Sequence, residues 1–104
     1  MTGRVRVLVW HRVADGELVA VEEAYRQVSQ GLRGTPGLLG SELLRSGQQP
    51  SSMLVMSEWE SLEAFRAWEE GTEHRAATAP LRPYRDHHRQ HPFELYQVTA
   101  AHPG

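Results

Sequence analysis

The chain contains no cysteine among its 104 residues, which excludes disulfides, thiolate chemistry and zinc sites built on cysteine. It contains no lysine either, so arginine supplies its positive side chains, and no basic run suits a nucleic-acid backbone. No apolar run approaches the length of a membrane span, and residues 1–5 lack the apolar core of a signal peptide. We therefore expect a cytoplasmic protein that binds neither nucleic acid nor membrane.

The composition that remains is that of an ordinary globular protein. Hydrophobic residues make up 39% of the chain and charged residues 23%, with a net charge of −2 when histidine is neutral. A chain of this length supports one small domain with a modest core, so we treat residues 1–104 as a single domain.

The apolar periodicity predicts four strands and two main helices. Apolar and polar residues alternate in four stretches, 4–13, 38–46, 53–59 and 92–99. Two other stretches repeat at three to four residues and predict amphipathic helices. The first is 16–33, whose apolar face holds Leu18, Val21, Tyr25, Val28 and Leu32. The second is 61–70, whose apolar face holds Leu62, Phe65 and Trp68.

Helix ends can be predicted from capping residues. Asp15 and Ser61 are suitable N-caps for the two main helices, and Gly71 ends the second. Thr72 is suited to cap a further short helix that ends before Pro80. We expect residues 80–91 to be irregular apart from one helical turn.

The order βαββαβ predicts an α+β, ferredoxin-like fold with a four-stranded antiparallel sheet and helices on one face. The helix-facing side is expected to hold Val5, Val7, Val9, Leu39, Leu43, Val55, Trp59, Phe93 and Leu95. The opposite side is also rich in apolar residues, namely Leu8, Trp10, Leu44, Leu54, Met56, Tyr96 and Val98. Because so apolar an exposed face usually meets a partner, we expect a homodimer whose sheets face each other, with arginines and glutamates pairing across the interface.

The junction between the third strand and the second helix is a candidate ligand wall. Trp59 ends the strand, and Phe65 and Trp68 follow on one helical face. Aromatic residues at this spacing also commonly form plain core, and the pattern leaves both interpretations open. Ser57 and Ser41 share the helix-facing side and can bind either a substrate carbonyl or the backbone.

His11 and His74 are the candidate catalytic bases. Histidine has an ordinary pKa of about 6.5, close to the value that suits a base at neutral pH. His11 ends the first strand on the helix-packed side, where we expect the mouth of a pocket, and His74 lies on the short helix across from it. Each can equally be a structural histidine bonded to the backbone.

The carboxy-terminal third carries a histidine cluster and several arginines. His87, His88 and His91 are spaced so that only two can readily converge, so we expect a solvated loop and no metal site. Arginines at 75, 82 and 85 are expected around the pocket entrance, where they can hold a flavin phosphate. Since no phosphate-binding fingerprint is present, a reduced flavin would be a diffusible cosubstrate.

The chain resembles the antibiotic biosynthesis monooxygenase family over nearly its whole length. The matching pieces are VLVWHRVADG, GTPGLLGSELLRS, VMSEWESLEAFRAWEEGTEHRAA and HPFELYQV. The most specific piece is the Glu-Trp-Glu-Ser junction, followed by Ala-Phe and by His-Arg-Ala-Ala downstream. The resemblance implies a dimeric α+β barrel, and a small oxygenase that acts with molecular oxygen on aromatic polyketides, heme or quinones.

Three positions separate this chain from two subgroups of that family. The heme ligand of the heme-degrading members falls at Thr78, which cannot replace an imidazole on iron, so we expect no heme. The polar partners of the anthrone-oxidising members fall at Val55 and Phe65. The sequence is more similar to the angucycline ring-opening oxygenases of jadomycin-, gilvocarcin- and kinamycin-type pathways.

That resemblance implies oxidative carbon–carbon cleavage of an angucycline-type hydroquinone, with reduced flavin (FADH2 or FMNH2) from a flavin reductase. The residues expected at the substrate are His11 and His74 as bases, with Trp59, Phe65, Trp68, Ser57 and Val55 around it. Two alternatives stay open, namely a cofactor-free, quinone-forming monooxygenase and a non-catalytic protein that binds a small molecule or assists an oxygenase.

Overall fold

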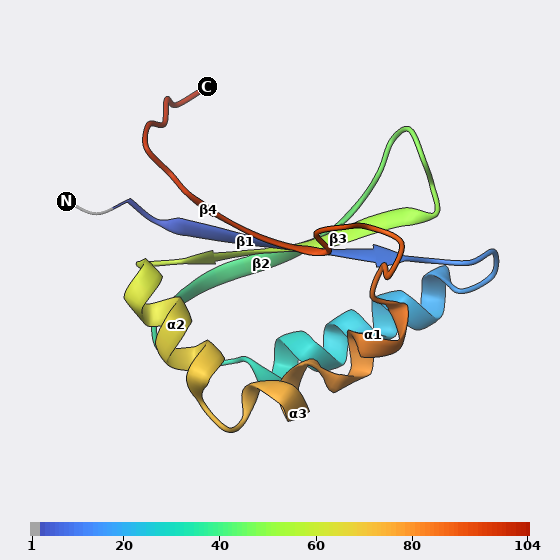
Figure 1. Cartoon of the computed structure of the whole chain (residues 1–104), viewed down its shortest axis with the longest axis horizontal. Coiled ribbons are helices and arrows are strands. Elements are labelled where there is room, and N and C mark those ends of the chain that lie inside the picture. Colours follow the sequence, from blue (N-terminus) through green and yellow to red (C-terminus); the bar gives the residue numbers. More distant parts are fainter. Residues whose placement is uncertain (1–2) are drawn as a thin grey trace.

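The computed structural model describes residues 3–104 and has two layers, a sheet and a set of helices on one of its faces (Figure 1). The antiparallel sheet has the order β2-β3-β1-β4. Its strands are β1 (Val5–Arg12), β2 (Leu38–Arg45), β3 (Ser52–Trp59) and β4 (Phe93–Gln97). The helices are α1 (Leu18–Gly31), α2 (Leu62–Glu70), α3 (His74–Thr78) and the 3-10 helix η1 (Ala79–Tyr84). The predicted ferredoxin-like βαββαβ fold is confirmed.

Strand pairing determines which side chains share the helix-facing side of the sheet. Val5 lies opposite Trp59, and His11 lies opposite Met53, so β1 and β3 run alongside each other over their full lengths. Directly paired residues point to the same face. The predicted inner set of β1 and β3 is therefore confirmed, with Val5, Val7, Val55 and Trp59 under the helices.

Strand β2 departs from simple alternation. Its register shifts between Leu38, which pairs with Trp59, and Gly40, which pairs with Glu58. The bulge adds one residue, so Leu38 packs into the core while Leu39 is 48% exposed. The prediction that Leu39 lies in the core is wrong for this reason.

The core divides into two clusters along the sheet. One is centred on Val21 and Val28 of α1 with Met53 and Leu81, and the other consists of Val5, Val7, Trp59 and Phe65. The predicted apolar stripe of α1 is confirmed, because Leu18, Tyr25 and Leu32 pack against the first cluster. No helix within residues 3–104 has the length and hydropathy needed to cross a membrane.

Of the three predicted N-caps, only that of α2 is confirmed. Ser61 Oγ accepts a hydrogen bond from the Ala64 N–H at 3.1 Å, and Gly71 ends the helix as predicted. The other two cap predictions are wrong, because the N-cap positions of α1 and α3 are Glu17 and Glu73, neither with a side-chain cap bond. Asp15 lies two residues before Glu17, and Thr72 lies one residue before Glu73, so neither occupies the N-cap position.

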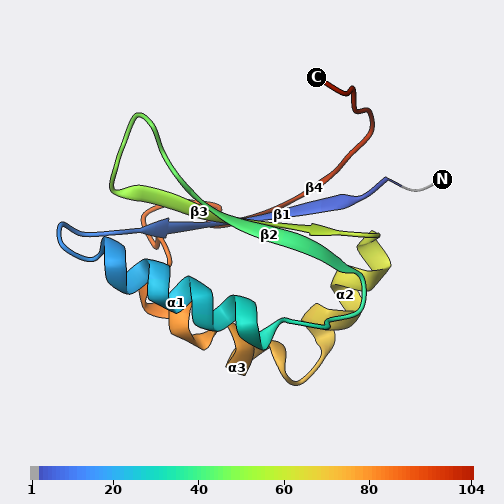
Figure 2. The same cartoon turned by 180° about the vertical axis from the view of Figure 1, so that it is seen from behind.

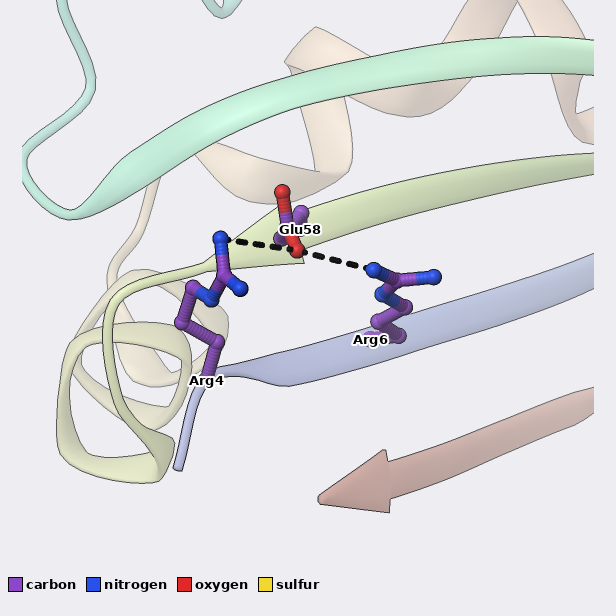
Figure 3. Close-up of polar contacts among 3 residues, drawn as sticks. All are labelled: Arg4, Arg6 and Glu58. Carbon is purple, nitrogen blue, oxygen red and sulfur yellow. Dashed lines mark hydrogen bonds and ion pairs between the residues drawn. The ribbon is translucent and has the colours of Figure 1, made fainter. Parts of the chain in front are cut away.

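The sheet face opposite the helices carries charged side chains that pair within the chain. Arg4 and Arg6 both approach one Glu58 carboxylate oxygen, at 3.7 Å and 3.2 Å (Figure 3). The loop between β2 and β3 and the segment after β4 both rise on this side of the sheet, away from the helices (Figures 1 and 2). The outer face is therefore the open one, and these two arginines already have a partner without a second chain.

Candidate active site

A cavity of about 410 Å³ lies between the sheet and the helices. Its lining includes Val7, Trp59 and Phe65 of one core cluster and Val28 and Leu81 of the other, so it separates the two. Cavities of roughly 300–1,000 Å³ are typical of small-molecule sites. The lining spans β1 from Val7 to His11, so the cavity follows the strand direction.

Four aromatic rings form one wall of this cavity. Trp59 contacts Phe65 edge-on at 5.4 Å between ring centroids and contacts Trp68 at 5.4 Å. Phe65 stacks on Phe93 of β4 at 6.0 Å, with the ring planes 24° apart. Such pairs stabilise the core beyond the area they bury. The rings come from β3, α2 and β4, so the wall joins the sheet edge to the helical layer.

The four rings differ in how much of their surface is accessible to a ligand. Trp59 is 1% exposed and Phe65 is 3% exposed, so their faces are largely covered by protein. Trp68 is partly buried and Phe93 is 44% exposed. The plain-core interpretation therefore describes Trp59 and Phe65 best, although both line the cavity, and Trp68 and Phe93 offer the more accessible ring surfaces.

Phe93 was placed on the helix-facing side but not among the predicted ligand residues. It lies opposite Val9 and near the start of the edge strand β4. The alternation of residues in β4 predicts which face of the sheet Phe93 occupies. Its stacking on Phe65 depends on how α2 packs against the sheet, which the sequence pattern of β4 does not indicate. The sequence likewise predicts Tyr25 only as core, and Tyr25 lines the cavity as well, with its hydroxyl bonded to Ser41 Oγ.

Two serines and a valine form the sheet floor of the cavity. The Trp59 indole N–H donates to Ser57 Oγ at 2.9 Å, and the Tyr25 and Ser41 hydroxyls share a hydrogen bond of 2.8 Å. Val55 lies between Leu43 and Val9 in the register and is apolar. Both serines thus serve neighbouring side chains, and each keeps a lone pair or proton for a ligand.

His11 is the most deeply buried polar side chain of the site. It is 2% exposed, and its Nδ1 has no hydrogen-bond partner. The expectation that it stands at the pocket mouth is wrong, because residues 85–86 cover it. Arg85 forms an isolated bridge with His11, and the Asp86 N–H donates to the Trp10 carbonyl at 3.1 Å.

This burial changes the chemistry of the imidazole. Desolvation, followed by the nearby Arg85 charge, lowers the pKa of His11 from 6.5 to about 4. A hydrogen bond from the ring to the Val9 backbone carbonyl and the Asp86 charge act in the opposite direction and are smaller. His11 is therefore neutral at neutral pH, and it has one ring nitrogen that can accept a proton, but it is a weaker base than its type predicts.

His74 lies at the opposite side of the cavity on α3. Its ring meets the edge of Trp68 at 5.4 Å, and its Nδ1 lies 3.4 Å from the Gly71 carbonyl. It is half-buried and lines the cavity together with His11. The cavity thus brings together all seven predicted site residues, which are His11, His74, Trp59, Phe65, Trp68, Ser57 and Val55.

Arginines face the cavity from the segment that follows α2. Arg75, Arg82 and Arg85 all line it, as expected, although Arg75 is exposed while the other two are half-buried. An Arg82 Nη donates to Thr78 Oγ1 at 2.8 Å and to the Arg75 carbonyl at 3.1 Å. Burial and the Arg82 charge together lower the pKa of Arg85.

Thr78 occupies the position at which the resemblance places a heme ligand. Its hydroxyl donates to the His74 carbonyl at 2.8 Å and accepts from Arg82. A threonine so engaged does not fit an axial iron position, so we derive no chemistry through heme.

The histidine-rich loop does not form a metal site in the part of the chain that the structure describes. His87, His88 and His91 are all exposed. Within residues 3–104, no three His, Asp or Glu side chains are grouped closely enough to hold a metal ion. The Asp86 carboxylate instead accepts a hydrogen bond from the His88 N–H at 3.0 Å.

Comparison with known proteins begins with a family model. The model of the family described as antibiotic biosynthesis monooxygenase matches residues 4–80. Protein SchA from Streptomyces halstedii is 37% identical over 81 residues, 78% of this chain and 21% of that protein. The 42.8 kDa protein in the whiE locus of Streptomyces coelicolor is 35% identical over 78 residues, 75% of this chain and 20% of that protein. The chain thus spans about a fifth of the length of these two relatives.

Two further comparisons concern proteins of similar size or fold. A mycobilin-producing heme oxygenase from Mycobacterium tuberculosis is 35% identical over 51 residues, which is 49% of each chain. A variant of SnoaB, described as a cofactor-independent oxygenase from Streptomyces nogalater, superposes with a TM-score of 0.76 over 98% of this chain and 99% of that one. At 17% identity, this second likeness shows the fold alone.

Proposed function

The chain belongs to the antibiotic biosynthesis monooxygenase family, and from that premise we propose that it oxidises a flat polycyclic aromatic polyketide with molecular oxygen. The observation that carries the proposal is the cavity itself, which combines an aromatic wall with one deeply buried neutral imidazole. A largely apolar cavity of about 410 Å³ with few polar groups suits a planar ligand.

We assign the binding of the ring system to the more accessible aromatic surfaces. Trp68 and Phe93 keep the more exposed ring surfaces, and Trp59 and Phe65 pack against them. Val55 and Val9 supply the flat floor, and Ser57 and Ser41 can each hydrogen-bond a ring oxygen. Stacking then fixes the plane of the substrate, and the serines fix its rotation within that plane.

The proposed catalytic step is removal of a proton from a phenol or hydroquinone. The ionised ring is more electron-rich and reacts more readily with oxygen, and a ligand that fills the cavity displaces water from it. His11 is the proposed proton acceptor, since it is neutral and carries an unpaired ring nitrogen. His74, which packs on Trp68, is the second candidate.

The finer proposal is oxidative ring opening of an angucycline-type hydroquinone with reduced flavin as a diffusible cosubstrate. One oxygen atom is inserted into a carbon–carbon bond next to a ring carbonyl, and water then hydrolyses the resulting lactone and opens the ring. The other oxygen atom leaves as water, with two electrons and two protons from the flavin. The Arg75, Arg82 and Arg85 cations suit an oxyanion such as a flavin phosphate, and the aromatic wall suits its ring system. In the cofactor-free alternative, a ring methylene supplies the electrons, and CH2 plus O2 becomes a carbonyl plus water.

We further propose that the active form is a homodimer through the outer face of the sheet. Trp10, Leu54 and Leu44 lie side by side in one row across three strands of this face. Leu44 and Tyr96 are 41% and 52% exposed in the single chain. Burying such a row between two sheets would form the dimeric α+β barrel.

The test is an aerobic incubation with a polycyclic aromatic hydroquinone, such as an angucycline, with and without a flavin-reducing system. Products are identified by mass, and His11→Gln and His74→Gln are run beside the wild type. We expect an oxygenated, ring-opened product that requires reduced flavin and is lost in His11→Gln. Product without flavin would support the cofactor-free alternative instead.

A second candidate function is binding without catalysis. The pKa of His11, about 4, is low for a base that works at neutral pH, and this observation favours a protein that only binds its ligand. Tight binding of the polycycle, measured by quenching of tryptophan fluorescence, with no turnover under either condition, would establish that function.

A further inference from the structure

The buried polar atoms that lack a partner gather around one cavity. Within residues 3–104 they are His11 Nδ1, Ser29 Oγ, Arg82 Nε and Arg85 Nε, and all four residues line the cavity. Unpaired buried polar groups are costly, so native structures contain few of them. Their concentration at one site, from β1, α1 and the segment around η1, indicates that a ligand completes their bonding.

Two of these residues carry positive charges that form no ion pair with a carboxylate. The ion pairs of the described residues involve Arg4, Arg6, Arg26 and Arg66, and neither Arg82 nor Arg85 is among them. Two carboxylates lie nearby. Glu69 pairs with Arg66, and Asp86, whose charge also acts on His11, accepts from the His88 N–H and forms no ion pair with either arginine. Half-buried guanidinium groups without a counter-ion favour an anion between them.

We propose that Arg82 and Arg85 form an oxyanion subsite that binds the substrate through an ionised ring oxygen, a phenolate, beside His11. This inference deepens the proposed function and rests on it for the identity of the ligand. The guanidinium groups favour the ionised form of the phenol and so lower its pKa. His11 faces Arg85 across the bridge, so the proton that leaves the phenol has an acceptor within the same part of the cavity.

The subsite resolves a difficulty of the mechanism. A buried imidazole of low basicity removes a proton poorly from an ordinary phenol, because proton transfer is efficient when donor and acceptor are matched. Stabilising the phenolate lowers the pKa of the phenol and so brings it nearer to the pKa of His11. A phenolate also offsets the Arg85 charge that disfavours protonation of His11, so binding raises the basicity of the acceptor at the same time.

A flavin phosphate is also an oxyanion and is therefore the competing ligand for these arginines. Arg75 is exposed, whereas Arg82 and Arg85 are half-buried next to the unpaired atoms. A phosphate on a flexible chain suits the exposed Arg75, whereas an oxygen attached directly to the ring system suits the inner pair. We therefore assign the inner pair to the substrate.

The experiment uses 2-hydroxyanthraquinone, a flat phenol whose ionisation is followed by visible absorbance and needs no turnover. We expect its pKa to fall by at least one unit on binding to the wild type, a tenfold or greater change in its acid dissociation constant. The shift should largely disappear in Arg85→Gln and Arg82→Gln. Arg33→Gln, which changes an exposed arginine after α1 outside the cavity lining, should keep it.

Three results would overturn the subsite. The first is an unshifted phenol in the wild-type protein, which requires no variant to fold. The second is a shift that survives both Arg82→Gln and Arg85→Gln. The third is FMN displacing the probe at least tenfold better than riboflavin in a manner that depends on Arg82 and Arg85. Because absorbance reports binding alone, a shifted phenol without turnover would retain the subsite and reject the oxygenase, and turnover without a shift would do the reverse.

Discussion

His11 and Arg85 face each other in an isolated antiparallel bridge, although 73 residues lie between them in the sequence. Burial, and after it the Arg85 charge, bring the pKa of His11 down to about 4. The irregular segment that follows η1 thus contributes to the protonation state of a side chain on β1, because Arg85 lowers the pKa of His11 and Asp86 raises it to a lesser extent.

The depressed pKa of His11 predicts an acid-sensitive contribution to stability. The unfolded chain, with an ordinary histidine pKa of about 6.5, binds more protons than the folded chain at any pH between about 4 and 6.5. The contribution is complete above about pH 6.5 and is lost as the pH falls to about 4, by about 3 kcal/mol at most. Urea unfolding between pH 7 and pH 4 measures the slope.

His11→Gln is the control for that slope, because it removes one titrating group and leaves all others in place. We expect the variant to lose less stability between pH 7 and pH 4 than the wild type. Equal slopes in the two proteins would show that His11 is not held neutral by the fold. A titration of the His11 ring by NMR gives the same answer at one site.

A second prediction concerns the Ser57 hydroxyl, which accepts a hydrogen bond from the Trp59 indole. Ser57→Ala leaves the Trp59 indole N–H without its acceptor at a position that is 1% exposed. An unpaired buried donor costs about 1–3 kcal/mol, so we expect a loss in that range by thermal or urea unfolding. Ser41→Ala is the matched control, since Tyr25 is only half-buried and its hydroxyl can find water in the cavity. An equal loss in both variants would contradict the explanation.

A third prediction concerns the turn between α1 and β2, which packs against α2. Gly37 has a φ of +84°, and a Cβ there would overlap the Ala64 Cβ. Gly34 has a φ of +82° but no atom within 4 Å of its Cβ position. Gly37→Ala should therefore cost about 2–4 kcal/mol, from backbone strain plus overlap, and Gly34→Ala only the strain of about 1–2 kcal/mol.

Ala64→Gly tests the overlap directly in a double-mutant cycle. The double variant Gly37→Ala with Ala64→Gly should be less destabilised than the sum of the two single changes, by about 1 kcal/mol or more. Additive losses would mean that strain at Gly37 is the whole effect.

Local patterns were sufficient where the structure depends on neighbours in sequence. Alternation in β1 placed His11 on the inner face, and Ser61 predicted its own cap. The bulge in β2 was not predictable, because Leu38 and Leu39 are equally apolar and only pairing with β3 decides which is buried. Alternation without the bulge therefore selected the wrong leucine.

The site shows the same division between local and distant causes. The sequence identified the residue types of the cavity, since the aromatic and histidine positions stand out along the chain. It did not predict that His11 is sealed, because the covering segment contains prolines and histidines and has no periodicity. The unpaired arginine atoms of η1 and Arg85 likewise depend on tertiary packing, and no spacing in the sequence indicates them.

The last prediction tests the proposed dimer. Leu54 lies at the centre of the outer-face row between Trp10 and Leu44, so Leu54→Asp would bury an unpaired charge between two sheets. We expect light scattering to give twice the 11.8 kDa chain mass for the wild type and the single mass for the variant. Leu44→Asp, at a side chain 41% exposed in the single chain, should dissociate the dimer without unfolding the monomer. Val19→Asp on α1, at a site 75% exposed in the helical layer, is the control that should remain dimeric. If Leu54→Asp and Leu44→Asp both stay folded and dimeric, the two chains associate through another surface, and the open face of the sheet needs a different partner.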